Sequence, residues 1–196
     1  MVDRTRDDGA RSSKTLVLGI GNLLLGDEGF GIHAVRRLRD EGLPDGVDLE
    51  DGGTGGVDLL DRMAGYGRVV LIDAIRVGRD SAPVSAEAGF GDRGSRAVGG
   101  AASEGDRPRA PAPGDVVVFR LNTVELENPD PRFSLHETSL GGLLRLAASL
   151  RIQLPEIDVV GFVPAAIAWS DALSPLGSAA IEVALARVRE LLAGRV

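Results

Sequence analysis

The chain has 196 residues, of which 43% are hydrophobic and 26% are charged, a length and composition that suit one globular domain. Its formal net charge of -7 argues against a nucleic-acid-binding protein, because such proteins usually present a basic face. The chain contains no cysteine, which excludes disulfides, a thiolate nucleophile and a cysteine-ligated zinc site.

Residues 1–14 are polar, carry charges of both signs and lack the apolar segment of a signal peptide. We expect a disordered N-terminal lead-in here, followed by a single domain over residues 15–196. No apolar run approaches the roughly 20 residues that a membrane-spanning helix needs. The sequence therefore predicts a cytoplasmic protein with no membrane partner.

Short apolar runs rich in branched side chains alternate with segments whose apolar residues recur at helical spacing. The runs predict five buried strands, at residues 15–20, 47–51, 68–73, 116–121 and 157–163. The spaced apolar residues predict helices around residues 32–38, 57–63, 140–147 and 181–192, the last beginning at Ser174 and Pro175. Strands that alternate with helices indicate an α/β domain with a mainly parallel sheet between two layers of helices.

The segment from about residue 78 to 113 differs from the rest of the chain. It is rich in Gly, Ala, Arg, Pro, Ser and Asp and shows no apolar period. We predict a flexible insertion there, either disordered or serving a partner, because structureless loops of this length are uncommon inside compact domains.

Acidic residues follow each of the first three predicted strands. Asp27 and Glu28 come after the first strand, Asp51 ends the second and Asp73 ends the third. Ligands bind beyond the carboxyl ends of the strands in open α/β sheets, so these carboxylates should gather at one edge. His136 follows the fourth strand; it reaches the same edge directly if that strand is parallel, and only through a loop that folds back if it is antiparallel.

Carboxylates placed together raise one another's pKa unless a cation neutralises them. Glu28, Asp73 and His136 would supply two oxygen ligands and one imidazole nitrogen, a set that suits zinc, nickel or another first-row divalent ion. Three protein ligands leave positions open for water or for ligands of a substrate. Each residue also has an ordinary explanation, since Glu28 favours a helix start, Asp73 can cap a loop and His136 can be a polar loop residue.

Three other residues have simpler interpretations. Asp27 is expected to stabilise a turn or to support the metal ligands from behind. His33 is expected to be a surface or partly buried residue of the first helix. Trp169, the only tryptophan, is expected to serve packing or surface contact rather than catalysis.

The Gly-rich segment from Gly19 to Gly31 is the most specific signal, with five glycines among thirteen residues between a strand and a helix. Here the sequence resembles the hydrogenase maturation endopeptidases of the HyaD/HybD/HycI type. The resemblance extends over nearly the whole chain except the lead-in and the insertion. The matching positions are Gly19-x-Gly21-Asn22, Asp27-Glu28-Gly29-x-Gly31, Asp51-Gly52-Gly53-Thr54, Asp73-Ala74, His136 and Val160-Gly161-x-Val163-Pro164.

The resemblance implies a twisted five-stranded sheet between helices. It also implies an aspartic-type endopeptidase that removes a C-terminal extension from the large-subunit precursor of a [NiFe]-hydrogenase, its transient partner, once nickel is inserted. Glu28, Asp73 and His136 match the family's metal ligands, and Asp51 matches a further acid that is important for activity. Nickel would be supplied by the precursor, and no organic cofactor is implied. The insertion is longer than the family pattern leads us to expect.

Two routes for the hydrolytic step and two rival functions stay open at this point. Either Asp51 acts as the general base for water, or the metal activates the water or polarises the carbonyl. A non-proteolytic nickel-binding checkpoint protein would use the same ligands. A dinucleotide-binding enzyme would use Gly19-x-Gly21, but Leu24 stands where its third glycine is needed and two acids would face the pyrophosphate. A serine hydrolase is disfavoured because no G-x-S-x-G sequence is present.

Overall fold

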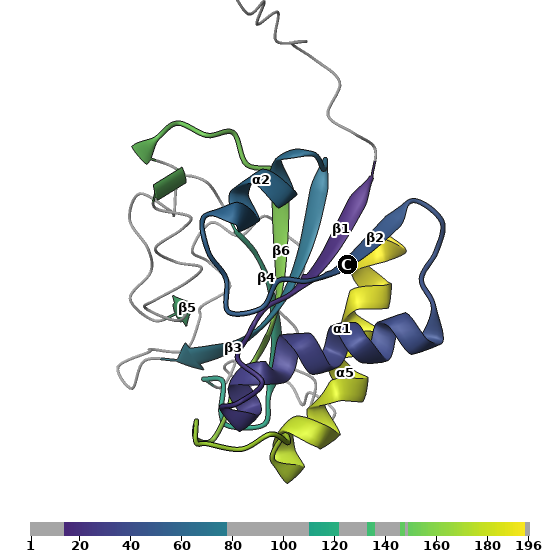
Figure 1. Ribbon diagram of the computed structural model, residues 1–196. Coiled ribbons are helices and arrows are strands. Elements are labelled where there is room, and N and C mark those ends of the chain that lie inside the picture. The colour runs from purple at the N-terminus through teal and green to yellow at the C-terminus, as the bar shows by residue number, and fades with distance from the viewer. Residues whose placement is uncertain (1–13, 78–109, 122–132, 136–145, 148, 195–196) are drawn as a thin grey trace, which may run out of the picture.

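The computed structural model describes residues 14–77, 110–121, 133–135, 146–147 and 149–194 (Figure 1). The strands are β1 (Thr15–Gly19), β2 (Val47–Asp51), β3 (Arg68–Val77), β4 (Val116–Leu121), β5 (Phe133–Leu135) and β6 (Glu156–Phe162). The helices are the 3-10 helix η1 (Gly26–Gly29), α1 (Phe30–Glu41), α2 (Asp58–Ala64) and α5 (Pro175–Leu192). The predicted helix at 140–147 and the predicted insertion at 78–113 lie largely outside the described residues.

Five strands form an open sheet in the order β2-β1-β3-β6-β4. β1, β2, β3 and β6 run parallel to one another, whereas β4 pairs antiparallel with β6. The prediction of a mainly parallel five-stranded α/β sheet is therefore confirmed, and the orientation of β4, which the sequence left open, is antiparallel.

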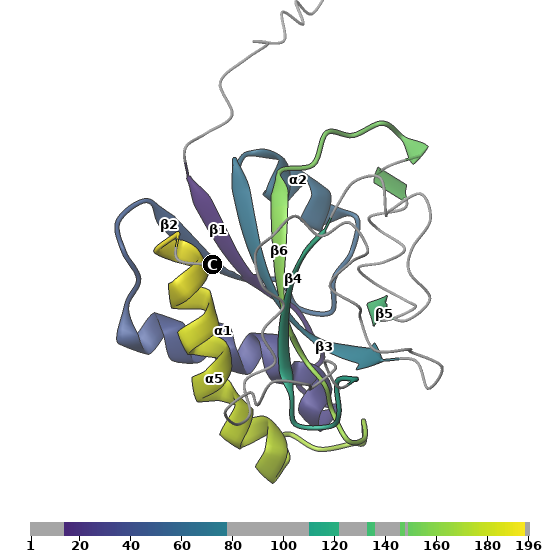
Figure 2. The same cartoon turned by 180° about the vertical axis from the view of Figure 1, so that it is seen from behind.

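β3 is longer than predicted. The sequence places its end at Asp73, but the strand continues to Val77. Pairing explains the difference, because β6 accompanies β3 as far as Ala74 and β5 then pairs antiparallel with residues 75–77. Figure 2 shows β5 beside this far end of β3 and apart from β4. Asp73 therefore lies inside a strand rather than in a loop.

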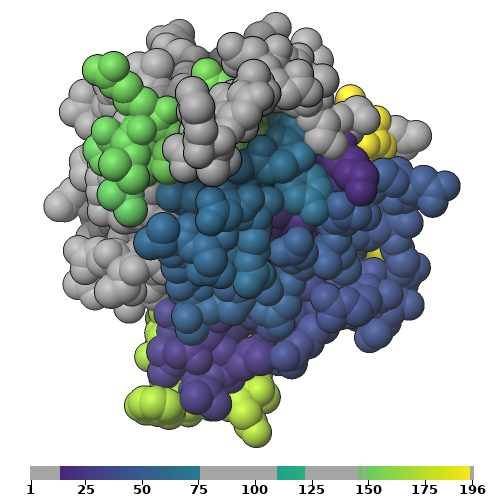
Figure 3. Space-filling view, turned by 45° about the horizontal axis from the view of Figure 1, so that its top comes forward, coloured from purple at the N-terminus to yellow at the C-terminus, as the bar shows by residue number. Residues whose placement is uncertain are grey.

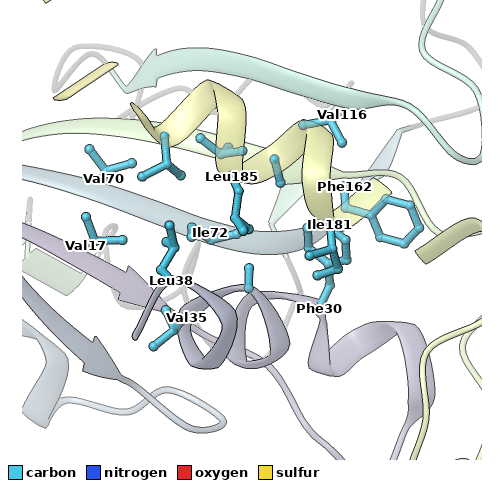
Figure 4. Packing of buried hydrophobic residues seen from close by; sticks show 14 of the residues in the cluster. Val17, Phe30, Val35, Leu38, Val70, Ile72, Val116, Phe162, Ile181 and Leu185 are labelled. Atoms are coloured by element: carbon cyan, nitrogen blue, oxygen red, sulfur yellow. The ribbon is translucent and has the colours of Figure 1, made fainter. Parts of the chain in front are cut away.

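Alternate residues of the strands build two apolar cores, one on each face of the sheet. α1 and α5 cover the first core, in which Phe30 stacks on Phe162 with ring centroids 4.4 Å apart (Figure 4). α2 covers the second core, where Leu59 and Met63 pack against residues such as Leu71. Among the helices described, none combines the length and apolar character that crossing a membrane requires.

α1 lies very close to the sheet because Gly31 faces the backbone of Ile20, just after β1, and of Ile72, in the middle of β3. A Cβ on Gly31 would come within 2.1 Å of the Ile72 carbonyl oxygen and 2.4 Å of the Ile20 carbonyl oxygen. Any side chain there would push the helix away from the two strands. The glycine thus fixes the start of α1, and the residues just before it, against β3 next to Asp73.

A buried carboxylate, Asp158 on β6, links β6 to its two neighbouring strands, β3 and β4. Its side chain accepts hydrogen bonds from Arg68 Nε at 2.7 Å and from Arg120 Nε at 2.8 Å. Arg68 Nη1 also donates to the Leu191 carbonyl at 2.7 Å, near the end of α5. Three strands and one helix therefore depend on one carboxylate that is only 3% exposed.

We predict that Asp158→Asn lowers the free energy of unfolding by about 3 kcal/mol, because it leaves two guanidinium groups without their buried partner. That figure is at the low end for breaking a buried pair, since Arg120 is partly exposed. Urea denaturation measures the change. Glu156→Gln is the matched control: its carboxylate contacts Arg120 at 3.5 Å but is 59% exposed, so its loss should cost less than about 1 kcal/mol. Equal losses in the two variants would contradict this account.

Candidate active site

The candidate site lies where the direction of the sheet connections reverses. β2 is added on one side of β1 and β3 on the other, so β1 and β3 flank the topological switch point. Ligands of open α/β sheets bind at the carboxyl ends of the strands at such a point. The loop that follows β1 and the Asp73 region of β3 meet here, since Ile20 N–H donates to the Ile72 carbonyl at 3.0 Å.

Residues 21–29 form a closed loop that delivers Glu28 to this edge. Asn22 organises it, because its Oδ1 accepts from Leu24 N–H at 3.0 Å, as expected for an Asn in a turn. Gly21 has φ +146°, and a Cβ there would lie 1.9 Å from the Glu28 carbonyl oxygen. A glycine is therefore required where the loop folds back against Glu28. Glu28 is half-buried in η1, directly before α1.

Asp73 is the most unusual polar residue of the site. Its side chain is 2% exposed, Oδ1 accepts from Ala74 N–H at 2.8 Å, and Oδ2 has no hydrogen-bond donor among the described residues. Burial raises the pKa of Asp73 well above its usual range; the Ala74 N–H lowers the pKa, and the nearby charge of Glu28 raises it further. The charge of Glu28 thus acts on the buried Asp73, and the role of the two residues as metal ligands stays a prediction.

The donor set of Glu28 and Asp73 is chemically suited to a cation, and their binding of a metal stays a prediction. A buried carboxylate oxygen without a donor is costly, and a metal ion would satisfy it and offset the repulsion by Glu28. Carboxylate oxygens suit hard or borderline divalent ions. In the described part of the chain, no three His, Cys, Asp or Glu side chains gather closely enough to complete such a site. Two carboxylates are present, and a metal bound here would need at least one further ligand from outside the described residues or from a substrate.

His136, the predicted third ligand, lies outside the described residues. The residue before it, Leu135, pairs with Ile75, which is two positions beyond Asp73 on β3. The chain after antiparallel β4 has therefore returned to the Asp73 end of β3 by residue 135. The role of His136 as a ligand stays a prediction.

Asp51 stands apart from the pair. β1 lies between the end of β2 and the Asp73 region of β3, since Gly19 pairs with Asp51 on one side and with Ile72 on the other. Two strand spacings amount to roughly 10 Å. Strand alternation also directs Asp51 towards the α1 face and Asp73 towards the α2 face. Asp51 Oδ1 accepts from Gly53 N–H at 2.9 Å, and Oδ2 lies 3.9 Å from Arg36 Nη2 on α1.

Asp27 has a structural role that the sequence did not specify. It is 3% exposed and accepts from Ser174 N–H at 2.8 Å and from Ser174 Oγ at 2.7 Å. Ser174 Oγ in turn accepts from Gly177 N–H at 3.1 Å and caps α5. Asp27 therefore ties η1, and with it Glu28, to the start of the last helix.

His33 is half-buried on α1, as predicted, and its Nε2 has no hydrogen-bond partner among the described residues. Burial and the neighbouring Arg36 lower the pKa of His33. Ser174 and Arg36 were missed as parts of the site. The N-cap sequence marked Ser174 as a helix start, but nothing local indicates a partner 147 residues away.

We predict that Asp73→Asn raises the melting temperature of the metal-free protein at pH 7. The folded chain keeps a proton that the unfolded chain releases above the usual Asp pKa of about 3.9, so the free energy of unfolding falls as the pH rises from there towards the raised folded pKa. The neutral amide removes this loss, and the gain should shrink as the pH falls towards about 4. Differential scanning fluorimetry across this range measures it.

Asp27→Asn is the matched control for that measurement. It exchanges one acceptor of the Ser174 bonds for a donor, so its melting temperature at pH 7 should fall. A lower melting temperature for Asp73→Asn at pH 7 would contradict the account of Asp73 as a carboxylate poorly stabilised without a cation.

Comparison with known proteins identifies relatives of one kind. The chain is 32% identical over 186 residues to the hydrogenase expression/formation protein HupM of Azotobacter chroococcum mcd 1, covering 94% of this chain and 74% of that protein. It is 45% identical over 71 residues to the hydrogenase 2 maturation protease of Escherichia coli K12, covering 36% and 43% of the two chains. No protein-family profile matches the chain.

Solved structures agree with the sequence relatives. The hydrogenase maturating endopeptidase HybD from E. coli superposes with a TM-score of 0.65 at 28% identity, over 92% of this chain and 93% of that one. A hydrogenase 2 maturation peptidase from Thaumarchaeota archaeon SCGC_AB-539-E09 gives 0.59 at 27% identity, over 93% and 99%. Fold, glycine-rich loop and relatives along nearly the full length lead to one conclusion: the chain belongs to the hydrogenase maturation protease family.

Proposed function

We propose that this endopeptidase of hydrogenase maturation removes the C-terminal extension of a [NiFe]-hydrogenase large-subunit precursor after nickel has been inserted. Membership of the family gives the class of reaction, peptide-bond hydrolysis during hydrogenase maturation. The observation that carries the finer proposal is the buried Asp73, whose Oδ2 finds no donor among the described residues and whose ionisation Glu28 opposes.

Nickel serves first as a recognition element in this proposal. Glu28, Asp73 and His136 bind the nickel of the precursor. Three ligands from this protein leave coordination positions open, so the nickel can stay bound to ligands of the precursor at the same time. A precursor without nickel offers no cation to replace the proton of the buried Asp73, so docking gains no interaction at this site. Cleavage then reports that nickel is in place.

Water attacks the scissile carbonyl in the hydrolytic step, with Asp51 as the general base. Asp51 is exposed to solvent at the same sheet edge and its carboxylate is held by Gly53 N–H and Arg36, which orient it without removing it from water. The proton taken from water passes to the leaving amine, so the enzyme is regenerated. Activation of the water by the metal is the competing route. The separation of Asp51 from Asp73 requires a substrate bond that lies between β2 and β3.

The central experiment compares two forms of one precursor. Nickel-loaded precursor should lose its C-terminal extension on incubation with this protein, as seen by mass spectrometry, whereas nickel-free precursor should stay intact. Cleavage of both forms at the same rate would contradict nickel recognition. Binding of the nickel-loaded form with no cleavage would instead indicate a nickel-binding factor without peptidase activity.

The Asp51→Asn variant separates binding from hydrolysis. We expect the loss of a general base to lower kcat by about 10²–10⁴-fold with an unchanged Kd for nickel-loaded precursor. Arg62→Gln is a useful control, because Arg62 contacts the Asp51 carbonyl at 3.4 Å and not its carboxylate. Normal turnover by Asp51→Asn would rule out the general-base role and favour activation by the metal.

A further inference from the structure

Two large apolar side chains are exposed beside the candidate site. Trp169 is 83% exposed and Leu24 is 60% exposed, although both belong to segments fixed by backbone hydrogen bonds. Leu24 lies in the loop that ends at Glu28, and Trp169 lies in the segment between β6 and α5. Figure 3 shows atoms of these two parts of the chain, purple and yellow-green, adjoining at the lower edge of the molecule.

A short parallel bridge brings the two backbone segments that carry these side chains together. Ser170 N–H donates to the Leu24 carbonyl at 3.1 Å, and Gly26 N–H donates to the Ser170 carbonyl at 2.8 Å, so Leu25 and Ser170 are paired. The residues preceding this pair, Leu24 and Trp169, therefore follow neighbouring stretches of backbone, about 4.8 Å apart at the bridge, and both are exposed. We call this pair the Leu24/Trp169 surface.

The surface stands on a rigid base. On one side of the bridge, Asp27 holds Ser174 through two hydrogen bonds. In the segment between the bridge and Ser174, Ser170 Oγ donates to the Ala172 carbonyl at 2.8 Å and accepts from Ala172 N–H at 3.1 Å. An apolar side chain on a backbone that is already ordered loses little entropy when a partner covers it, and tryptophan is prominent among residues that dominate binding energies.

We propose that the Leu24/Trp169 surface is a docking surface for the polypeptide substrate, contacting an apolar patch of the precursor outside the cleaved bond. The inference rests on the proposed function, because it assumes a folded protein substrate. Leu24 and Glu28 belong to one closed loop, so a protein that brings a group to Glu28 and Asp73 has to cover the adjacent surface. The contact is continuous with the active site and extends it.

The charge of the surrounding residues favours the polypeptide substrate over an anionic membrane and over a second copy of this chain. Residues 21–29 and 163–178 contain no Lys or Arg, and their acids include Glu28 and the exposed Asp171. An anionic membrane surface is recognised by basic residues, which these segments lack. A second copy of the chain docking about a two-fold axis would bring the same acidic rim against itself. A protein partner with an apolar patch and a basic rim complements both the apolar pair and the acids.

The test uses the full chain and nickel-loaded precursor. Trp169→Ser and Leu24→Ser should each raise KM about tenfold or more and leave kcat at saturation unchanged, because the lost contact is remote from the reacting bond. Leu150→Ser is the matched control: Leu150 is 61% exposed but precedes the amino end of β6, away from the site edge. Its KM should equal that of the unchanged protein.

A second measurement observes the surface directly. Trp169 is the only tryptophan, so 5-fluorotryptophan incorporated into this chain alone gives a single ¹⁹F resonance. Adding unlabelled nickel-loaded precursor should shift this resonance and remove its solvent-isotope dependence, as a side chain that is 83% exposed becomes covered.

The outcomes separate the docking surface from the reaction. If the unchanged protein cleaves the precursor but both serine variants keep its KM and the ¹⁹F resonance does not move, the docking surface is wrong and the proposed function stands. If the unchanged protein does not cleave nickel-loaded precursor, the proposed function is wrong and the docking inference with it. A dimer of this chain that the serine variants dissociate, with KM unchanged, would assign the surface to a second copy and overturn the proposal.

Discussion

The burial of the Asp73 carboxyl group is the constraint on which the proposed site depends. Asp73 lies inside β3 at the switch point of the sheet, 2% exposed, with one oxygen bound to Ala74 N–H and the other without a donor in the described ranges. A carboxylate in such a place is unfavourable alone and favourable with a cation. The nearby charge of Glu28 adds to this cost, and the proposed binding of a cation would offset both.

The same edge is built by contacts distant in the chain. Gly31 allows α1 to approach Ile72, Gly21 lets its loop close on Glu28, and Asp27 fastens that loop to Ser174. One clamp therefore positions both Glu28 and the bridge that carries Leu24 and Trp169. The same hydrogen bonds between Asp27 and Ser174 therefore hold the loop that carries Glu28 and the bridge beside the proposed docking surface. This connects the proposed recognition of nickel with the proposed docking of the precursor.

Local patterns predicted most of the fold. Apolar runs located β1, β2, β4 and β6 to within a residue or two, and Ser174 with Pro175 marked the start of α5. The length of β3 and the direction of β4 were not predictable, because both depend on which strand pairs with which. Glu28 and Asp73 were predicted to meet by the rule for carboxyl ends of parallel strands. The partners Ser174 and Arg36 were missed since their contacts cross 147 and 15 residues of sequence.

The most direct test of the central claim is the position of nickel in a crystal of this protein with nickel-loaded precursor, located by anomalous scattering at the nickel absorption edge. The account predicts one nickel ion bound by oxygens of Glu28 and Asp73 at about 2.0–2.2 Å, with an imidazole nitrogen of His136 as the third protein ligand. A complex in which the nickel ion of the precursor lies far from the Glu28 and Asp73 carboxylates would contradict it.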